Sequence, residues 1–257
     1  MAIEIRPVNP HFVAGIGGID LSKSVDRPVV AAISEAIDRY AVVVFRDQRL
    51  DDTQLRDFAS KFGALEIGRG AARGGRRRLA HPEIGDISNL DEDGRLRQRD
   101  DRRRLDSLGN WLWHSDASYM PVPVVLGMLY AVAVPPASAL GGGETEFADM
   151  RAAYDALSEV MKAALDGLVA EHDVFWSRGQ IGFTEFLPGE REQYRRHGSG
   201  WCAVIRARSA KRSTSPPTPR TSSAGPFPKA ACCSTISIRT PPGRNSSTAM
   251  NGGSAIW

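Results

Sequence analysis

The sequence of 257 residues predicts one main domain built from both helices and strands. Residues 27–40 place apolar side chains at helical spacing, and residues 41–45 (AVVVF) form the short β-branched run typical of a buried strand. Residues 110–134 change to a strand-like pattern over NWLWHSDASY and VVLGMLYAVAV. These three stretches predict the mixed α+β class.

The elements between these stretches follow from local signals. Asp51 or Asp52 is expected to cap a helix that carries Leu55 and Phe58, with Gly63 at its C-terminal end. Residues 67–80, rich in Gly and Arg, are expected to form a mobile loop, and the charged residues 91–106 an exposed loop.

The second half begins with a glycine turn at residues 141–143, which leads into Glu144-Thr145-Glu146-Phe147. Asp149 is expected to cap an Ala-rich helix, and a second helical piece should follow to about Ala170.

Near residue 200 the composition changes, which divides the chain into a domain over 1–197 and a low-complexity tail over 198–257. The tail is rich in Ser, Thr and Pro and shows no apolar period, so composition indicates disorder. A frameshift in the gene is a second interpretation. Codons permitted for residues 246–257 give the strand-like FVYRHEWRIGDL in a neighbouring register, and sequencing the locus tests this.

Charge and targeting signals limit the partners and the location that we expect for this protein. Residues 193–257 hold ten Lys or Arg and no Asp or Glu, so the tail alone sets the net charge of +3, and we expect no nucleic-acid partner. No apolar run reaches the length of a membrane span, and the first residues lack a signal-peptide core, so we expect a cytoplasmic protein. Cys202, Cys232 and Cys233 match no zinc or redox motif. The sequence leaves open whether the protein forms a homo-oligomer.

His114 and Asp116 form the most informative pair. In a strand, side chains two residues apart point to the same face, so this imidazole and this carboxylate are expected to bind one metal ion together. Two His and one carboxylate make the facial triad that holds non-heme Fe(II) and leaves positions open for a 2-oxo acid and O2. Taken alone, a His-x-Asp pair is more often a surface or structural feature.

Several collinear motifs strengthen this interpretation. VVVFRDQRL, FASKFGALE, IGDISNLDEDG, LWHSDASY and GGGETEFADMRAAYDAL together resemble the taurine/2,4-dichlorophenoxyacetate family of Fe(II)- and 2-oxoglutarate-dependent dioxygenases, in particular its aryloxyalkanoate branch. The resemblance runs from about residue 5 to about residue 196. It implies a β-dominated double-stranded β-helix (jelly roll) with flanking helices, which lacks its last strands if the tail forms none.

The resemblance also implies roles for particular residues. His114 and Asp116 match the family's first two iron ligands, and Thr145 matches its 2-oxoglutarate contact. Arg95 falls where the phenoxyacetate branch has a basic residue near the substrate carboxylate, and Ser118 falls at a pocket position. A solvated loop charge is the competing interpretation of Arg95, and an ordinary strand position that of Ser118.

One departure from the family bears on activity. Its distal His and the Arg that pairs with 2-oxoglutarate should lie beyond residue 200, whereas no His follows His197. The sequence therefore predicts an oxygenase of a small carboxylated substrate, such as an aryloxyalkanoate, with weak or absent turnover. An inactive remnant of such an enzyme, a taurine or sulfonate dioxygenase, and a protein whose basic tail binds polyanions are the alternatives.

Overall fold

The structure is a computed structural model that describes residues 3–67, 76–120, 124–134, 144–166, 170–186, 189–190, 197–199, 235–239 and 252–256. Most of the expected loop over 67–80, the glycine turn at 141–143 and the three cysteines lie outside these residues. The chain divides into two compact units. Unit 1 comprises Met1–Gln98, Val125–Glu146 and Cys233–Trp257, and unit 2 comprises Arg99–Val124 and Phe147–Cys232.

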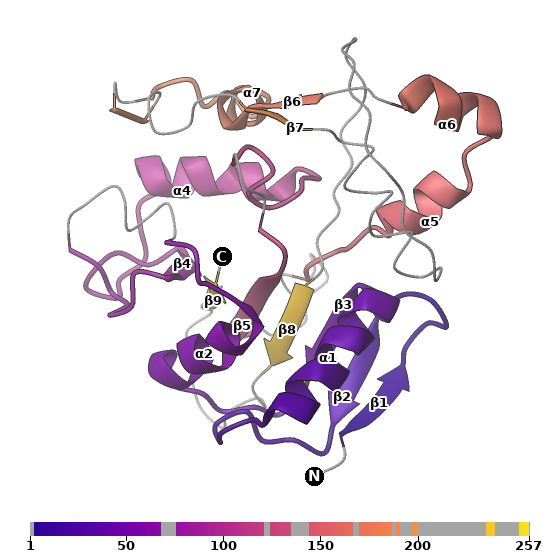
Figure 1. The fold of residues 1–257 in the computed structure, drawn as a ribbon. Helices are drawn as coiled ribbons and strands as arrows, with labels where there is room; N and C mark the ends of the chain where they lie inside the picture. The colour runs from indigo at the N-terminus through magenta and orange to yellow at the C-terminus, as the bar shows by residue number, and fades with distance from the viewer. Residues whose placement is uncertain are drawn as a thin grey trace. The chain divides into compact units, whose positions relative to one another are not determined.

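Unit 1 is organised around one mixed sheet of seven strands in the order β1-β2-β3-β8-β5-β9-β4 (Figure 1). In chain order these are β1 Glu4–Pro7, β2 Ala14–Gly17, β3 Val42–Phe45, β4 Ile84–Ser88, β5 Gly127–Ala133, β8 Thr235–Arg239 and β9 Gly252–Ile256. The central strands β2, β3, β8 and β5 run parallel to one another, while β1 pairs antiparallel with β2, β9 with β5, and β4 with β9. The strands β3 and β5 confirm two of the sequence predictions.

The two strands from the tail correct the expectation that residues 198–257 form none. Strand β8 lies between β3 and β5, with Val43 opposite Ile236 and Phe45 opposite Ile238. The signal is present in the sequence, because Thr235-Ile236-Ser237-Ile238 alternates polar and apolar residues. Its four residues are too few to stand out from a tail rich in Ser and Thr.

Two helices of unit 1 begin where their capping residues predict. Helix α1 (Arg27–Tyr40) is capped by Asp26, whose side chain accepts a hydrogen bond from the Val29 N–H. Helix α2 (Asp52–Ala59) carries a capping box in which Asp51 and Gln54 bond each other's backbone, and the 3-10 turn η1 (Ser60–Phe62) continues it to Gly63. Gly63 has a φ of 148°, a conformation open mainly to glycine, so it ends the turn as expected.

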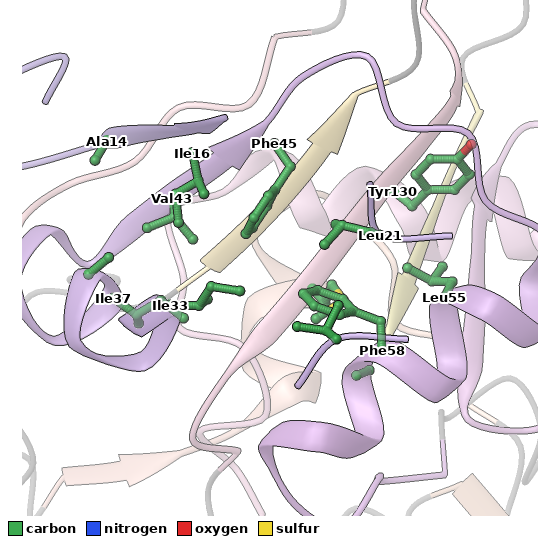
Figure 2. Close-up of a cluster of buried hydrophobic side chains, with 14 of the residues drawn as sticks. Ala14, Ile16, Leu21, Ile33, Ile37, Val43, Phe45, Leu55, Phe58 and Tyr130 are labelled. Atoms are coloured by element: carbon green, nitrogen blue, oxygen red, sulfur yellow. The ribbon is translucent and has the colours of Figure 1, made fainter. Parts of the chain in front are cut away.

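The core of unit 1 lies between these helices and the sheet. Figure 2 shows Ile33 and Ile37 of α1 beside Val43 of β3, and Leu55 and Phe58 of α2 in the same cluster. These side chains are buried, which accounts for the helical spacing of the apolar residues in α1 and α2.

Unit 2 is made of short elements. They are α4 Arg102–Ser107, η2 Leu108–Trp111, α5 Met150–Asp155, α6 Glu159–Leu165, β6 Ala170–His172, α7 Val174–Gly179 and β7 His197–Ser199. Strands β6 and β7 pair antiparallel. Asp149 caps α5 as predicted, through the Arg151 and Ala152 N–H groups. The predicted helix to about Ala170 ends instead at Leu165, and Ala170 begins a strand.

Two further expectations in unit 2 are wrong. The charged stretch 91–106 is not loop throughout, because Asp101 caps α4 and Asp106 is buried. Residues 110–119 are not a strand. They pass from η2 into an irregular segment and a turn, and no described strand pairs with them. The alternating pattern gave a wrong prediction because the side chains of Trp111 and Trp113 are exposed and line no buried face.

The mixed content of helices and strands confirms the predicted α+β class. Among the described residues, no helix combines the length and the apolar character that crossing a bilayer requires.

Candidate metal centre

His114 and Asp116 lie in unit 2, in the irregular segment that follows η2. The distance from His114 Nε2 to Asp116 Oδ1 is 3.0 Å, so the two side chains meet although no strand aligns them. Their side chains are 40% and 24% exposed, so both are partly accessible to solvent.

This spacing fits a shared metal ion. Imidazole nitrogen and carboxylate oxygen bind first-row divalent metals at about 2.1 Å, so two such ligands at a right angle stand about 3.0 Å apart. The separation of 3.0 Å in the structure is that of an ordinary hydrogen bond and is also compatible with this value. Nitrogen and carboxylate oxygen are also the donor set of non-heme iron sites.

The other ring nitrogen of His114 fixes which nitrogen can bind a metal. Nδ1 lies 2.6 Å from the backbone oxygen of Leu112. A carbonyl oxygen can only accept, so a proton on Nδ1 is donated to Leu112. Asp116 Oδ1, which faces Nε2, is an acceptor as well, so in the absence of a metal the two contacts together suit a ring that carries both protons. A metal that replaced the Nε2 proton would leave the Nδ1 proton bonded to Leu112, as in metal-binding histidines.

The electrostatics of the pair agree with this geometry. The hydrogen bond to Asp116 raises the pKa of His114 above its ordinary value, against the opposing effect of burial. The Leu112 carbonyl raises this pKa further, and the positive charge of Arg178 lowers it. Either a proton or a metal cation can therefore bridge Nε2 and Oδ1, because both place positive charge between the same two atoms.

The backbone turns sharply directly after Asp116. Ala117 has a φ of 50°, in the left-handed region that residues with a Cβ rarely adopt. The turn closes with a hydrogen bond of 2.9 Å from the Met120 N–H to the Ala117 oxygen. Strain of this kind persists where the surrounding structure requires it.

The other predicted site residues are spread over both units. Ser118 lies in the turn after Asp116 and is partly buried. Thr145 belongs to unit 1, is exposed, and lies outside any helix or strand. Arg95 also belongs to unit 1. Its side chain is 79% exposed and pairs with Asp93 at 3.5 Å, as a solvated loop charge does. Within unit 2, the structure brings together His114 and Asp116.

No third ligand is evident from the described part of the chain, which holds no group of three His, Cys, Asp or Glu side chains suited to a metal. His172 and His197 are opposite each other in the pairing of β6 with β7. No histidine follows His197 in the sequence.

Sequence reasoning missed the partners that support the pair. The Leu112 carbonyl is a backbone group, which no residue pattern reveals. Arg178 donates to Asp106 and Asn110, just before the pair, yet it lies about seventy residues further along the chain. A buried Arg could have been suspected only if the burial of α7 had been foreseen.

A histidine and a carboxylate two residues later are the residue types that metal sites of the histidine–carboxylate type use. Comparison with known proteins shows the family of the chain. The family described as "Taurine catabolism dioxygenase TauD, TfdA family" matches residues 4–226, and the chain belongs to it. The match continues past residue 197, the expected end of the domain.

Individual relatives fall in the aryloxyalkanoate branch. The chain is 40% identical over 191 residues to the alpha-ketoglutarate-dependent 2,4-dichlorophenoxyacetate dioxygenase of Cupriavidus pinatubonensis, covering 74% of this chain and 65% of that enzyme. It is 36% identical to the (S)-phenoxypropionate/alpha-ketoglutarate-dioxygenase of Sphingobium herbicidovorans, covering 76% of this chain and 62% of the relative. The chain thus spans less than two thirds of either enzyme.

A solved structure is similar as well. The crystal structure of AAD-2 in complex with Mn(II) and N-oxalylglycine matches with a TM-score of 0.67 and 41% identity, over 77% of this chain and 66% of that one. The sequence-based assignment to the family and to its aryloxyalkanoate branch is confirmed.

Proposed function

We propose that this chain binds Fe(II) through His114 and Asp116 and serves the 2-oxoglutarate-dependent oxidation of a small carboxylated substrate, of the aryloxyalkanoate type. The observation that carries the proposal is the 3.0 Å approach of His114 Nε2 to Asp116 Oδ1, in a chain whose relatives are named as dioxygenases of phenoxy acids. Bound Fe(II), with 2-oxoglutarate and O2, supplies the oxidation of an unactivated C–H bond.

The residues of the chain have separate roles in this proposal. His114 keeps its proton on Nδ1, held by the Leu112 oxygen, and offers Nε2 to the metal. Asp116 supplies a negative charge that offsets part of the charge of the cation. The hydroxyl of Thr145 donates a hydrogen bond to a carboxylate of 2-oxoglutarate. Arg95 pairs with the substrate carboxylate, and Ser118 lines the pocket.

The proposal extends to the fold. The TauD-like match supports a jelly roll as the arrangement from which this chain derives, built over residues 1–197. For residues 198–257 we retain the proposal of a low-complexity, frame-shifted tail, from which the described strands β8 and β9 still join the sheet.

A second candidate is a catalytically inactive remnant that still binds metal. One observation favours it: no histidine follows His197, although the family's distal ligand is expected beyond residue 200. Two protein ligands bind Fe(II) more weakly than three, so turnover would be weak or absent even where metal binds.

One experiment separates these candidates. The purified chain is incubated with Fe(II), 2-oxoglutarate and O2, and succinate formation is measured with 2,4-dichlorophenoxyacetate, (S)-phenoxypropionate or taurine as substrate. Substrate-dependent succinate that is lost in His114→Ala supports the oxygenase, and the preferred substrate identifies the branch. Metal binding without succinate supports the remnant. A chain that binds no Mn(II) or Fe(II) contradicts both.

A further inference from the structure

Arg178, the penultimate residue of α7, is buried at 6% exposure, which is unusual for a charged side chain unless it is paired. Its Nε donates to Asp106 Oδ1 at 3.2 Å, and its Nη2 donates to Asn110 Oδ1 at 2.9 Å. Its Nη1 lies 3.3 Å from Ser177 Oγ. Asp106 and Asn110 both belong to the α4–η2 segment that leads to His114.

The guanidinium reaches these acceptors by passing over Gly109. A Cβ built on Gly109 would stand 2.4 Å from both Cδ and Nη1 of Arg178, closer than real Cβ contacts come. Gly109 is buried in η2, so the Arg178 side chain occupies the space that any other residue at 109 would need.

A continuous set of contacts joins this arrangement to the metal pair. The Leu112 N–H donates to the Gly109 oxygen at 3.3 Å, which ends η2. The oxygen of the same Leu112 accepts the Nδ1 proton of His114 at 2.6 Å. The position of that oxygen therefore depends on η2, and η2 is held by Arg178.

We propose that Arg178 is a positioning residue: packed on Gly109 and bonded to Asp106 and Asn110, it fixes the Leu112 carbonyl that holds Nδ1 and so sets the direction of the His114 ring. The metal-affinity part of this inference rests on the proposed function. The part that concerns the ring direction does not, because the Nδ1–Leu112 hydrogen bond is observed with no metal present.

A second ion pair in unit 2 provides a structural control. Arg102, at the start of α4, pairs with the buried Glu190 and lies 5.4 Å from the ring of Phe183. It stabilises α4 at the end away from η2. Loss of this pair should destabilise the unit without turning the Leu112 carbonyl.

The test compares Gly109→Ala and Arg178→Met with two matched variants, Gly179→Ala and Arg102→Met. Gly179 is exposed, and a Cβ there meets nothing within 4 Å. Two quantities are measured on the full chain: the Mn(II) dissociation constant, and the NMR signal of the hydrogen-bonded Nδ1–H group of His114 in the metal-free chain at a pH where the ring carries both protons. The spectrum of His114→Gln assigns the signal.

The expected result is a loss of Mn(II) affinity of about 10- to 100-fold in Gly109→Ala and Arg178→Met, as for other residues that orient a metal ligand. In both variants the Nδ1–H signal should lose the low-field shift and the protection from exchange that its 2.6 Å hydrogen bond to Leu112 confers. Gly179→Ala and Arg102→Met should keep the native Nδ1–H signal. The double variant Gly109→Ala/Arg178→Met should be no worse than Arg178→Met, because the clash partner is gone.

A native Nδ1–H signal and native Mn(II) affinity in Arg178→Met would overturn the proposal, as would additive losses in the double variant. If Gly109→Ala does not fold, Arg178→Lys carries the test, since its shorter ammonium side chain should restore part of the native signal. If the native chain binds no Mn(II) yet shows the hydrogen-bonded Nδ1–H signal, which is lost in Arg178→Met, the proposed function fails and the positioning role stands.

Discussion

Replacement of Asp116 by Asn tests the metal pair most directly. The change keeps the size of the side chain and an oxygen able to lie near His114 Nε2, but it removes the negative charge. The carboxylate lies 3.0 Å from Nε2, the separation of two neighbouring ligands on one ion. If Asp116 binds the metal, its charge contributes to affinity directly.

The size of the effect follows from the loss of a charged partner. Polar contacts to charged groups contribute about 1.5–3 kcal/mol. At about 1.4 kcal/mol per factor of ten, the dissociation constant for Mn(II) should rise by about 10- to 150-fold. The larger end is expected here, because the described residues offer few other ligands to compensate.

Calorimetric titration of the metal-free chain with Mn(II) measures this dissociation constant directly. Asp166→Asn is the matched control, since Asp166 is an exposed carboxylate of the same unit. It should bind Mn(II) as the native chain does. If Asp116→Asn also binds Mn(II) as tightly as the native chain, Asp116 is no ligand and the assignment of the site fails.

Three further predictions concern stability. Leu55→Ala empties a site with 0% exposure and should lower the free energy of unfolding by about 2.7–5 kcal/mol in denaturant titration; a near-neutral result would contradict the described core. Tyr130→Phe removes the hydroxyl that accepts the Leu50 N–H at 3.1 Å, and should cost about 1 kcal/mol in the same assay. For Asp149, burial alone would raise the pKa, but hydrogen bonds and the charge of Arg151 outweigh it and lower the pKa below 3.8. Its stabilising contribution is therefore present above pH 3.8 and lost as the pH falls through the lower folded value, so Asp149→Asn should unfold with a shallower acid dependence; an unchanged acid slope would refute this.

Local signals succeeded where the residues that cause an element are neighbours in the chain. Asp51 and Gln54 form their capping box within one turn, and α1 shows its buried face in its own spacing. The strand predicted over 110–119 failed because a strand exists only where another strand pairs with it. Alternation at Trp111 and Trp113 does not supply such a partner.

The candidate site shows the same division. The sequence identified His114 and Asp116 as a pair, on an argument from strand geometry that the structure does not bear out. A turn and the Leu112 carbonyl hold the two side chains together instead. The roles predicted for Thr145 and Arg95 stay predictions.

By itself, the sequence determined the family, the helices with their caps, and the pairing of His114 with Asp116. These depend on residue types at short spacing, and short spacing survives in any fold that the chain adopts. Tertiary structure alone decided that β8 enters the sheet beside β3, that Arg178 is buried on Gly109, and that the Leu112 oxygen faces Nδ1 of His114. Each of these depends on contacts between residues far apart in the sequence or on backbone groups. A pattern of neighbouring side chains does not reveal either.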